Sequence, residues 1–167
     1  PPPLPVTSPA IVRATHAGYL QFIAPDELLS TAEAANLVAR VECAPGDYIL
    51  PSMPIASIWP SDAVTDELAQ AIRGPFQLGS ERTLVQDLLF AMRQLSDIAI
   101  RALSPAINDP TSAVEGIDAV GAMLLRLGRR RLGDSGIVDD DGALRLVMPT
   151  PGWDELVDLG LTEIRRY

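Results

Sequence analysis

The 167-residue sequence has no lysine, one histidine and one cysteine. All 13 basic residues are therefore arginines, which excludes a Schiff-base lysine, a phosphate-loop lysine and a lysine that carries biotin or lipoyl. A serine triad could form only through His16, and zinc sites built from several cysteines and histidines are excluded by count. Cys43 cannot form an internal disulfide, so nothing points to an oxidising compartment, and we expect it to be a small core residue. We expect neither a metal nor a cofactor.

Positive charge is also scarce, because 22 acidic residues and 13 basic ones give a net charge of −9. An acidic chain repels phosphate backbones, so we expect no nucleic-acid partner. The one basic cluster, Arg129-Arg130-Arg131 before Gly133, suits the negative end of a helix followed by a glycine cap. A phosphate or lipid-headgroup site is the alternative explanation of the cluster.

Long apolar runs are absent as well. Apolar residues make up 47% of the chain but aromatic ones only 5%, which predicts a packed core of aliphatic side chains. No segment reaches the roughly 20 apolar residues of a membrane span, and no signal peptide is visible. The proline-rich start, residues 1–9, is expected to be a stiff linker that follows a preceding segment.

Residues 10–60 are expected to form a β-rich subdomain. Short runs of β-branched and aromatic residues favour strands, Leu37–Cys43 alternates most clearly, and Pro25 begins a short helix. The run from Val41 to Ile58 resembles the hairpin of lipoyl-like barrel-sandwich domains, with its turn at Ala44–Asp47. The carrier function of such domains cannot accompany the fold, because there is no lysine.

Residues 61–167 are expected to be a helical subdomain that contains a β-hairpin near 136–148. The capping patterns predict helices from Ser61 or Asp62 to about Ile72, from Leu84 to about Leu103, from Pro110 to about Leu132, and from Pro151 onward. The second and third helices should form an antiparallel pair, because a short proline-bounded turn joins them. The predicted class is α+β, either as these subdomains or as one continuous domain.

One stripe of the helix from Leu84 is polar. Steps of 100° per residue place five side chains on it: Asp87, Phe90, Gln94, Asp97 and Arg101. Three interpretations remain open: a solvated face with an Asp97–Arg101 ion pair, a buried polar network between helices, or a ligand site.

The following turn, Ser104–Pro110, is rich in capping and turn-forming side chains. Asp109 can cap the next helix and Asn108 can form a side-chain turn, which is a structural explanation. The functional alternative is a small anionic ligand held near the helix N-terminus. The candidate ligand-binding residues are Asp87, Gln94, Asp97, Arg101, Ser104, Asn108 and Asp109.

The helix from Pro110 is apolar on most sides. Gly121 and Gly128 would allow another helix to approach closely, so this helix is either central in the domain or half of a dimer interface. We therefore expect a homo-oligomer.

The segment that starts at Arg82 resembles the signature of a family of predicted bacterial membrane proteins known only as a domain of unknown function. The matching elements are Arg82-Thr83, Gln86-Asp87, Phe90, Arg93–Leu95, Asp97–Ala99, Arg101–Pro105 and Ile107–Ala113, with further likeness in Gly18–Gln21, Pro45–Asp47 and Leu159–Tyr167. Ala106 departs from the glycine usual in the family. The resemblance implies transmembrane helices ahead of a soluble region, and this chain would be that region.

The resemblance favours a regulatory, sensing or assembly domain without catalysis of its own, on the cytoplasmic side, with the membrane-spanning part of the same protein as a partner. Two alternatives remain: a pure oligomerisation module, and an enzyme that acts on a small anionic substrate. The enzyme would use carboxylates with Arg101, drawn from Asp87, Asp97, Asp109 and Glu115.

Overall fold

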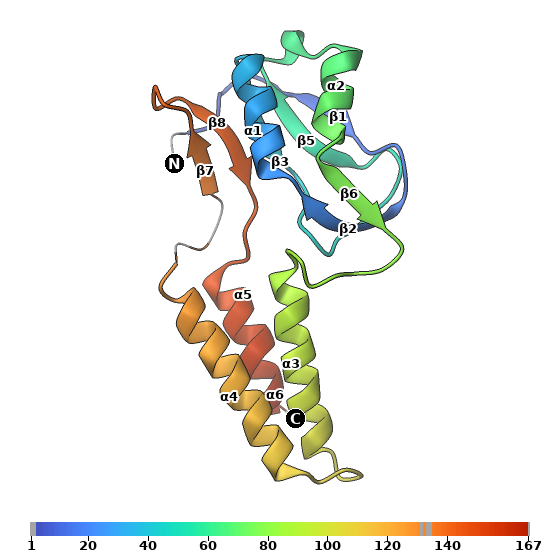
Figure 1. Cartoon of the computed structure of the whole chain (residues 1–167), viewed down its shortest axis with the longest axis vertical. Coiled ribbons are helices and arrows are strands. Elements are labelled where there is room, and N and C mark those ends of the chain that lie inside the picture. Colours follow the sequence, from blue (N-terminus) through green and yellow to red (C-terminus); the bar gives the residue numbers. More distant parts are fainter. Residues whose placement is uncertain (1–2, 131, 133–134, 167) are drawn as a thin grey trace. The chain divides into compact units, whose positions relative to one another are not determined.

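The computed structural model describes residues 3–130, 132 and 135–166. The chain folds into two compact units, one made of residues 1–87 and 134–150 and the other of residues 88–133 and 151–167. The first unit contains the strands and the second is helical (Figure 1), which confirms the α+β class. Arg131, Gly133 and the start of the proline-rich segment, about which the sequence led to expectations, lie outside the described residues.

A mixed five-stranded sheet runs through the first unit in the order β1-β5-β3-β8-β7. These strands are β1 (Ala10–Arg13), β5 (Pro54–Trp59), β3 (Val38–Val41), β8 (Leu144–Met148) and β7 (Ser135–Val138). Neighbouring strands are antiparallel except for β3 and β8, which are parallel. β5 is buried along nearly its whole length, as expected for a strand that is covered on both faces.

A second sheet of three strands has the order β4-β2-β6, from β4 (Tyr48–Ile49), β2 (Gly18–Ile23) and β6 (Phe76–Gly79). Two helices belong to the same unit: α1 (Pro25–Ala34), which begins at the predicted proline, and α2 (Asp66–Arg73). A short 3-10 turn, η1 (Ser61–Ala63), precedes α2. The core of the unit is aliphatic, as composition predicts, and includes Leu20, Ile23, Leu28, Leu37 and Ile58, each with 1% exposure or less.

The expected barrel-sandwich hairpin around Ala44–Asp47 is not formed. β3 and β4, the strands on either side of that turn, belong to different sheets, and β3 pairs with β5 instead. The turn itself is present, because the Asp47 carboxylate accepts a hydrogen bond from the backbone N–H of Ala44 at 2.8 Å.

The predicted hairpin near 136–148 is present as β7 and β8, but it extends the five-stranded sheet. Arg145 holds it there, because its Nε donates to Asp139 at 2.6 Å and its Nη1 to the Asn36 side chain at 2.7 Å. The hairpin predicted within the helical part of the sequence is therefore part of the strand-rich unit, a long-range pairing that local patterns do not encode.

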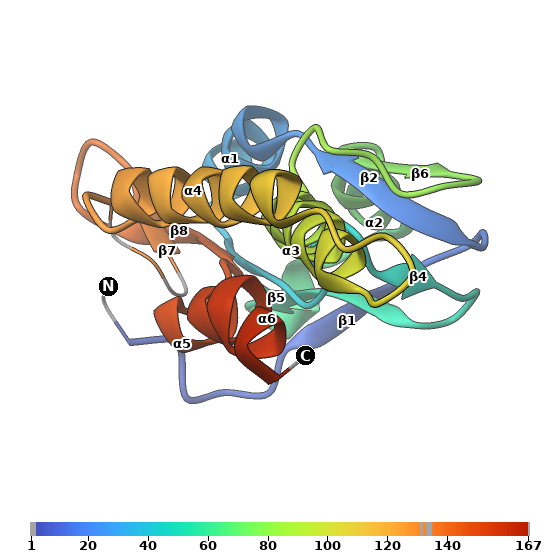
Figure 2. The same cartoon turned by 90° about the horizontal axis from the view of Figure 1, so that it is seen from below.

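The second unit consists of α3 (Leu88–Leu103), α4 (Pro110–Leu127) and a C-terminal helical segment. α3 and α4 run antiparallel side by side (Figures 1 and 2), and a methyl group added at Gly116 would lie 3.1 Å from the Cβ of Ala99. The expected antiparallel pair is thus confirmed. Met92, Val120, Leu124 and Leu156 form the centre of this unit's core.

The C-terminal segment changes helix type along its length, from α5 (Trp153–Val157) through a π-helical turn, η2 (Asp158–Thr162), to α6 (Glu163–Arg166). Gly160 of η2 lies against α3 and α4: a Cβ there would come within 2.8 Å of the Met92 sulfur and 2.9 Å of Val120 Cγ1. Ser96 of α3 is fully buried and donates to the carbonyl of Leu159 at 2.9 Å. The C-terminal segment therefore packs on α3 and α4 at Gly160, which has no side chain, and is held by the hydrogen bond of the buried Ser96 hydroxyl.

Two helix starts differ from the sequence-based prediction. α3 begins at Leu88 rather than Leu84. Thr83 and Gln86 have the residue types of a capping box, but the box is not formed, because the Thr83 hydroxyl has no hydrogen-bond partner in the described part of the chain. α2 begins at Asp66, because Thr65 rather than Ser61 or Asp62 caps it. α4 ends at Leu127, earlier than expected.

Candidate functional site

The first part of the signature is an anchor on strand β2. The side-chain amide of Gln86 pairs with the backbone of Ile23 twice, accepting from its N–H and donating to its C=O, each at 2.9 Å. Gln21 in turn donates to the carbonyl of Glu81 at 2.8 Å. A side chain that satisfies both backbone groups of one residue replaces a strand partner, so the segment before α3 is attached to the sheet.

Asp87 completes this anchor and is 3% exposed. Its Oδ2 accepts from Arg82 Nε at 2.8 Å and lies 2.6 Å from Arg82 Nη2. Gly46 fits against the carboxylate because it has no side chain: a Cβ at that position would overlap Oδ2. Asp87, a predicted stripe residue, therefore lies before α3 in the first unit and forms an ion pair in which the carboxylate is buried and Arg82 is partly exposed.

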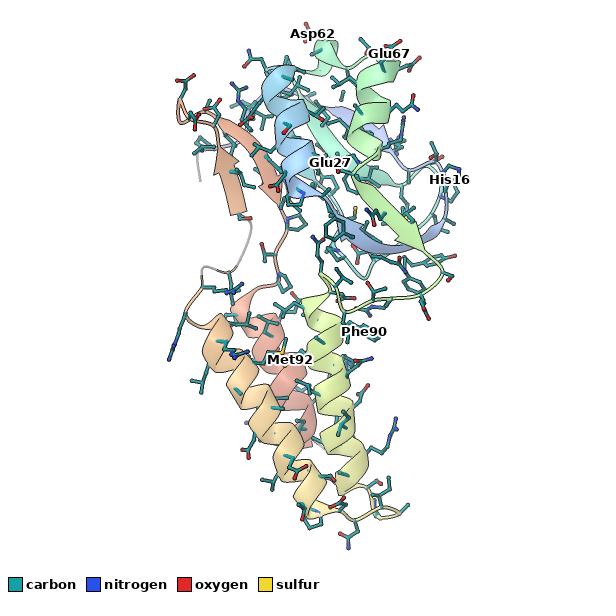
Figure 3. The ribbon with its side chains drawn as sticks, in the orientation of Figure 1. His16, Glu27, Asp62, Glu67, Phe90 and Met92 are labelled. Atoms are coloured by element: carbon teal, nitrogen blue, oxygen red, sulfur yellow. The ribbon has the colours of Figure 1, made fainter. Side chains whose placement is uncertain are left out.

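Three of the four remaining stripe residues are solvated. Gln94, Asp97 and Arg101 are exposed, and among the described residues Asp97 and Arg101 make no ion pair. The interpretation as a buried network is therefore wrong. The opposite side of α3 is the buried one, with Met92, Ala99 and Ala102, and Met92 lies toward the interior of the unit (Figure 3).

Sequence reasoning missed two further polar residues of the helical unit. One is Ser96, whose hydroxyl is buried against the C-terminal segment. The other is Arg93, which pairs with Glu163 of α6. The available signal was the position of Ser96 four residues after Met92, on the apolar side of the helix.

The turn between α3 and α4 is held by hydrogen bonds among its own residues and the start of α4. The backbone N–H of Asn108 donates to the carbonyl of Ser104 at 2.8 Å, and Asn108 has a left-handed φ of 47°. Asp109 caps α4 by accepting from the Ser112 backbone at 3.1 Å and from its hydroxyl at 2.6 Å. Those bonds lower the pKa of Asp109. Ser104, Asn108 and Asp109 thus come together in one structural turn, and ligand binding there stays a prediction.

The exposed face of α4 is apolar. Val114, Ile117 and Leu125 are 56%, 38% and 74% exposed, and nothing lies within 4 Å of a Cβ built at Gly121. At 100° per residue these four lie within about 80° of arc, and we call them the α4 stripe. Buried residues of α4, including Val120 and Leu124, face the core instead.

Charged residues border the α4 stripe on one side. Glu115 and Asp118 precede Gly121 in the sequence, whereas Arg126 and Arg129 follow it. All four are exposed; helical spacing puts Glu115, Asp118 and Arg126 on the same flank, and Arg129 lies two residues beyond the end of α4. The described face therefore has an apolar centre, an acidic N-terminal half and a basic C-terminal half.

The candidate carboxylates are dispersed. Asp87 is buried in the first unit, Asp97 is exposed on α3, Asp109 caps α4, and Glu115 is on the surface of α4. In the part of the chain that the structure describes, no three histidine, cysteine, aspartate or glutamate side chains lie close enough to hold a metal ion.

The sequence matches the family model for the predicted membrane protein family DUF2254 over residues 1–167. The chain belongs to this family. It is 34% identical over 170 residues to the uncharacterised protein Mb1321c of Mycobacterium bovis and to the uncharacterised protein Rv1290c of Mycobacterium tuberculosis. The match covers 99% of this chain and 33% of each relative, so the chain spans about a third of the length of these curated relatives.

No solved structure matches the chain. Among the described residues, none of the helices has the length and apolar character needed to cross a membrane.

Proposed function

We propose that the helical unit is an assembly module, in which the α4 stripe pairs two copies of this protein and so joins two copies of a longer membrane protein. The observation that carries the proposal is the exposed α4 stripe itself. Monomeric soluble proteins rarely leave a contiguous apolar face on a helix, and such a face usually marks an interaction site.

The pattern of the α4 stripe favours an antiparallel partner of the same kind. With a two-fold axis at Gly121, Ile117 of one copy lies opposite the partner subunit's Leu125. Gly121 has open space above it, so two helices can approach closely at that point. A two-fold pairing of this type is self-complementary, as the commonest homodimer interfaces are.

The charges beside the α4 stripe support the same orientation. A two-fold axis perpendicular to the plane of two antiparallel helices places the same flank of each helix side by side. Glu115 and Asp118 of one copy then face the arginines that follow Gly121 in the other copy. A parallel two-fold pairing would place the charged flanks of the two copies on opposite sides of the helix pair, so these contacts between opposite charges would not form.

A substitution in the α4 stripe tests the proposal. We expect the chain to sediment as a dimer that dissociates on dilution, and Leu125→Glu to be monomeric at concentrations where the unaltered chain is dimeric. Val85→Glu is the matched control, because Val85 is 72% exposed against 74% for Leu125 but lies outside the α4 stripe. A monomeric unaltered chain, or a dimer that survives Leu125→Glu, would contradict the proposal.

Charge reversal tests the orientation. Glu115→Arg and Arg126→Glu should each weaken the dimer, and the double variant should restore it, because the two charges exchange places across the interface. A double variant that is weaker than either single one would exclude the antiparallel arrangement.

The cytoplasmic side is the compartment we propose for this part of the protein. The chain has one cysteine and no disulfide is possible within it, which suits a reducing compartment. A fluorescent-protein fusion and an alkaline-phosphatase fusion at Tyr167 of the full-length protein would distinguish the two sides, since the first fluoresces in the cytoplasm and the second is active outside it.

A further inference from the structure

A cleft of about 320 Å³ opens in the first unit, and the described residues that line it all belong to that unit. Its floor is apolar, from side chains that include Ile49, Ile55 and Phe76. The polar side chains of its lining are those of Thr15, His16 and Arg73, and we call these three residues its rim. An apolar cavity of this size with a few convergent polar groups is the usual form of a small-molecule site.

Arg73 is the fixed cation of the rim. It is the last residue of α2, and its Nε donates to the carbonyl of Arg13 at 2.8 Å, which orients the guanidinium group. Within the described residues Arg73 makes no ion pair, although the chain carries a net charge of −9. An oriented guanidinium without a carboxylate partner can accept an anionic group through its terminal nitrogens.

His16 and Thr15 provide further polar groups beside Arg73. Thr15 Oγ1 and His16 Nδ1 lie 2.9 Å apart, a hydrogen bond that positions the imidazole ring. His16 is in the loop between β1 and β2 (Figure 3) and reaches the solvent. The only histidine of the chain thus lies at the mouth of this cleft.

A second hollow limits the charge of the ligand. It has a volume of about 490 Å³, shares Thr15 and Arg73 with the first cleft, and continues along α2 to Gln70 and Asp66. The Asp66 carboxylate disfavours a second negative charge on this side of Arg73. A ligand with one negative charge fits this surface better than a phosphate dianion does.

We infer that this cleft binds an amphipathic monocarboxylate, with its apolar chain on the floor and its carboxylate on Arg73 beside His16 and Thr15. The apolar floor excludes water from the chain of the ligand, which is the main source of its affinity. The guanidinium provides charge-assisted hydrogen bonds that select the carboxylate. This inference does not depend on the α4 stripe, because the two surfaces belong to different units.

Calorimetric titration of the whole chain with octanoate, below its micellar range, tests the inference. Octanoate should bind more tightly than octan-1-ol, which lacks the charge, and more tightly than inorganic phosphate, which lacks the apolar chain. Equal affinity for phosphate and octanoate, or no binding of octanoate, would overturn the inference.

Two variants locate the carboxylate. Arg73→Gln should weaken octanoate binding by about tenfold or more, the range of a lost charge-assisted hydrogen bond. His16→Gln changes an exposed residue, so the fold is preserved, and it should weaken binding by a smaller factor of about two to five. Arg101→Gln is the matched control and should leave the affinity unchanged. Unaltered octanoate affinity in both Arg73→Gln and His16→Gln would overturn the inference.

Discussion

Two aspartates of the signature, ten residues apart, have opposite environments. Asp87 is 3% exposed and paired with Arg82, whereas Asp97 is exposed and has no ion pair among the described residues. Removal of a carboxylate is costly when it leaves a buried charged partner without its counter-ion. The two positions should therefore differ in their contribution to the free energy of unfolding.

We expect Asp87→Ala to lower the free energy of unfolding by about 2–4 kcal/mol, less than a fully buried pair would cost because Arg82 is partly solvated. Asp97→Ala should change it by no more than about 0.5 kcal/mol, as is usual for a surface position. Arg101→Ala should behave like Asp97→Ala, and not as a member of a buried network would. Urea denaturation measures all three, and a similar midpoint for Asp87→Ala and Asp97→Ala would contradict the assignment.

Gly46 is a second residue whose role follows from its neighbours. Its φ is 100°, and a side chain there would displace the Asp87 carboxylate. Gly142 also has a positive φ, of 79°, but nothing lies within 4 Å of a Cβ at that position. A substitution at Gly142 therefore adds backbone strain alone, whereas a substitution at Gly46 adds both backbone strain and steric overlap with Asp87.

Gly142→Ala should cost about 1 kcal/mol, the price of placing a side chain in this backbone region. Gly46→Ala should cost about 1–3 kcal/mol more, because an overpacked contact is added to the same strain. Comparison of the two unfolding midpoints checks this, and equal effects would show that the Gly46–Asp87 contact relaxes freely.

At the scale of elements, the start of α4 depends on one carboxylate. Bonds from the Ser112 hydroxyl and backbone hold the pKa of Asp109 below its ordinary value of 3.8. A lowered folded-state pKa means that the stabilisation is fully present above pH 3.8 and is lost as the pH falls through the folded pKa.

Asp109→Ala should therefore lower the melting temperature at neutral pH. The difference in melting temperature between this variant and the unaltered chain should become smaller as the pH falls below 3.8. Thermal melts followed by circular dichroism over a pH series measure the difference. Asp97→Ala is the control and should show no comparable trend. A difference that persists unchanged at low pH would mean that Asp109 does not act through its charge.

Local patterns were sufficient to predict several elements. Residues close together in the sequence define three of them: the start of α1 at its proline, the start of α4 at the Asp109 cap, and the β7–β8 hairpin. The antiparallel α3–α4 pair follows from the short connection between them. Secondary structure that depends on neighbouring residues is therefore readable from the sequence.

The failures arise where distant residues decide the structure. Thr83 and Gln86 match a capping box, but the Gln86 amide bonds Ile23, 63 positions away, and α3 starts later. The parallel pairing of β3 with β8 likewise joins segments with no local signal. The position of the polar stripe was predictable by angle, but its exposure depends on which side of α3 meets α4.

At the scale of the whole molecule, each unit has its own core. One is centred on the sheets and includes Ile58, and the other is centred on Met92 and Leu156. Ile58 and Leu156 are both fully buried, so truncation of either leaves a cavity in one unit only.

Leu156→Ala should destabilise the helical unit by about 2–5 kcal/mol and speed amide exchange in α3 and α4, with a smaller effect on β3 and β5. Ile58→Ala is the matched variant and should show the reverse pattern. Hydrogen-exchange mass spectrometry resolves the two units. Equal loss of protection throughout the chain in both variants would mean that the two cores open as one.

The buried thiol of Cys43 has a consequence for how the first unit can be observed. Burial, with Asp47 and Glu42 nearby, raises the pKa of this thiol to about 12, and the side chain is 5% exposed. The native thiol is therefore almost unreactive, since only the thiolate attacks alkylating reagents. Modification therefore requires opening of the segment between β3 and β4, and because the chain has no other cysteine, the rate of alkylation reports the rate of that opening.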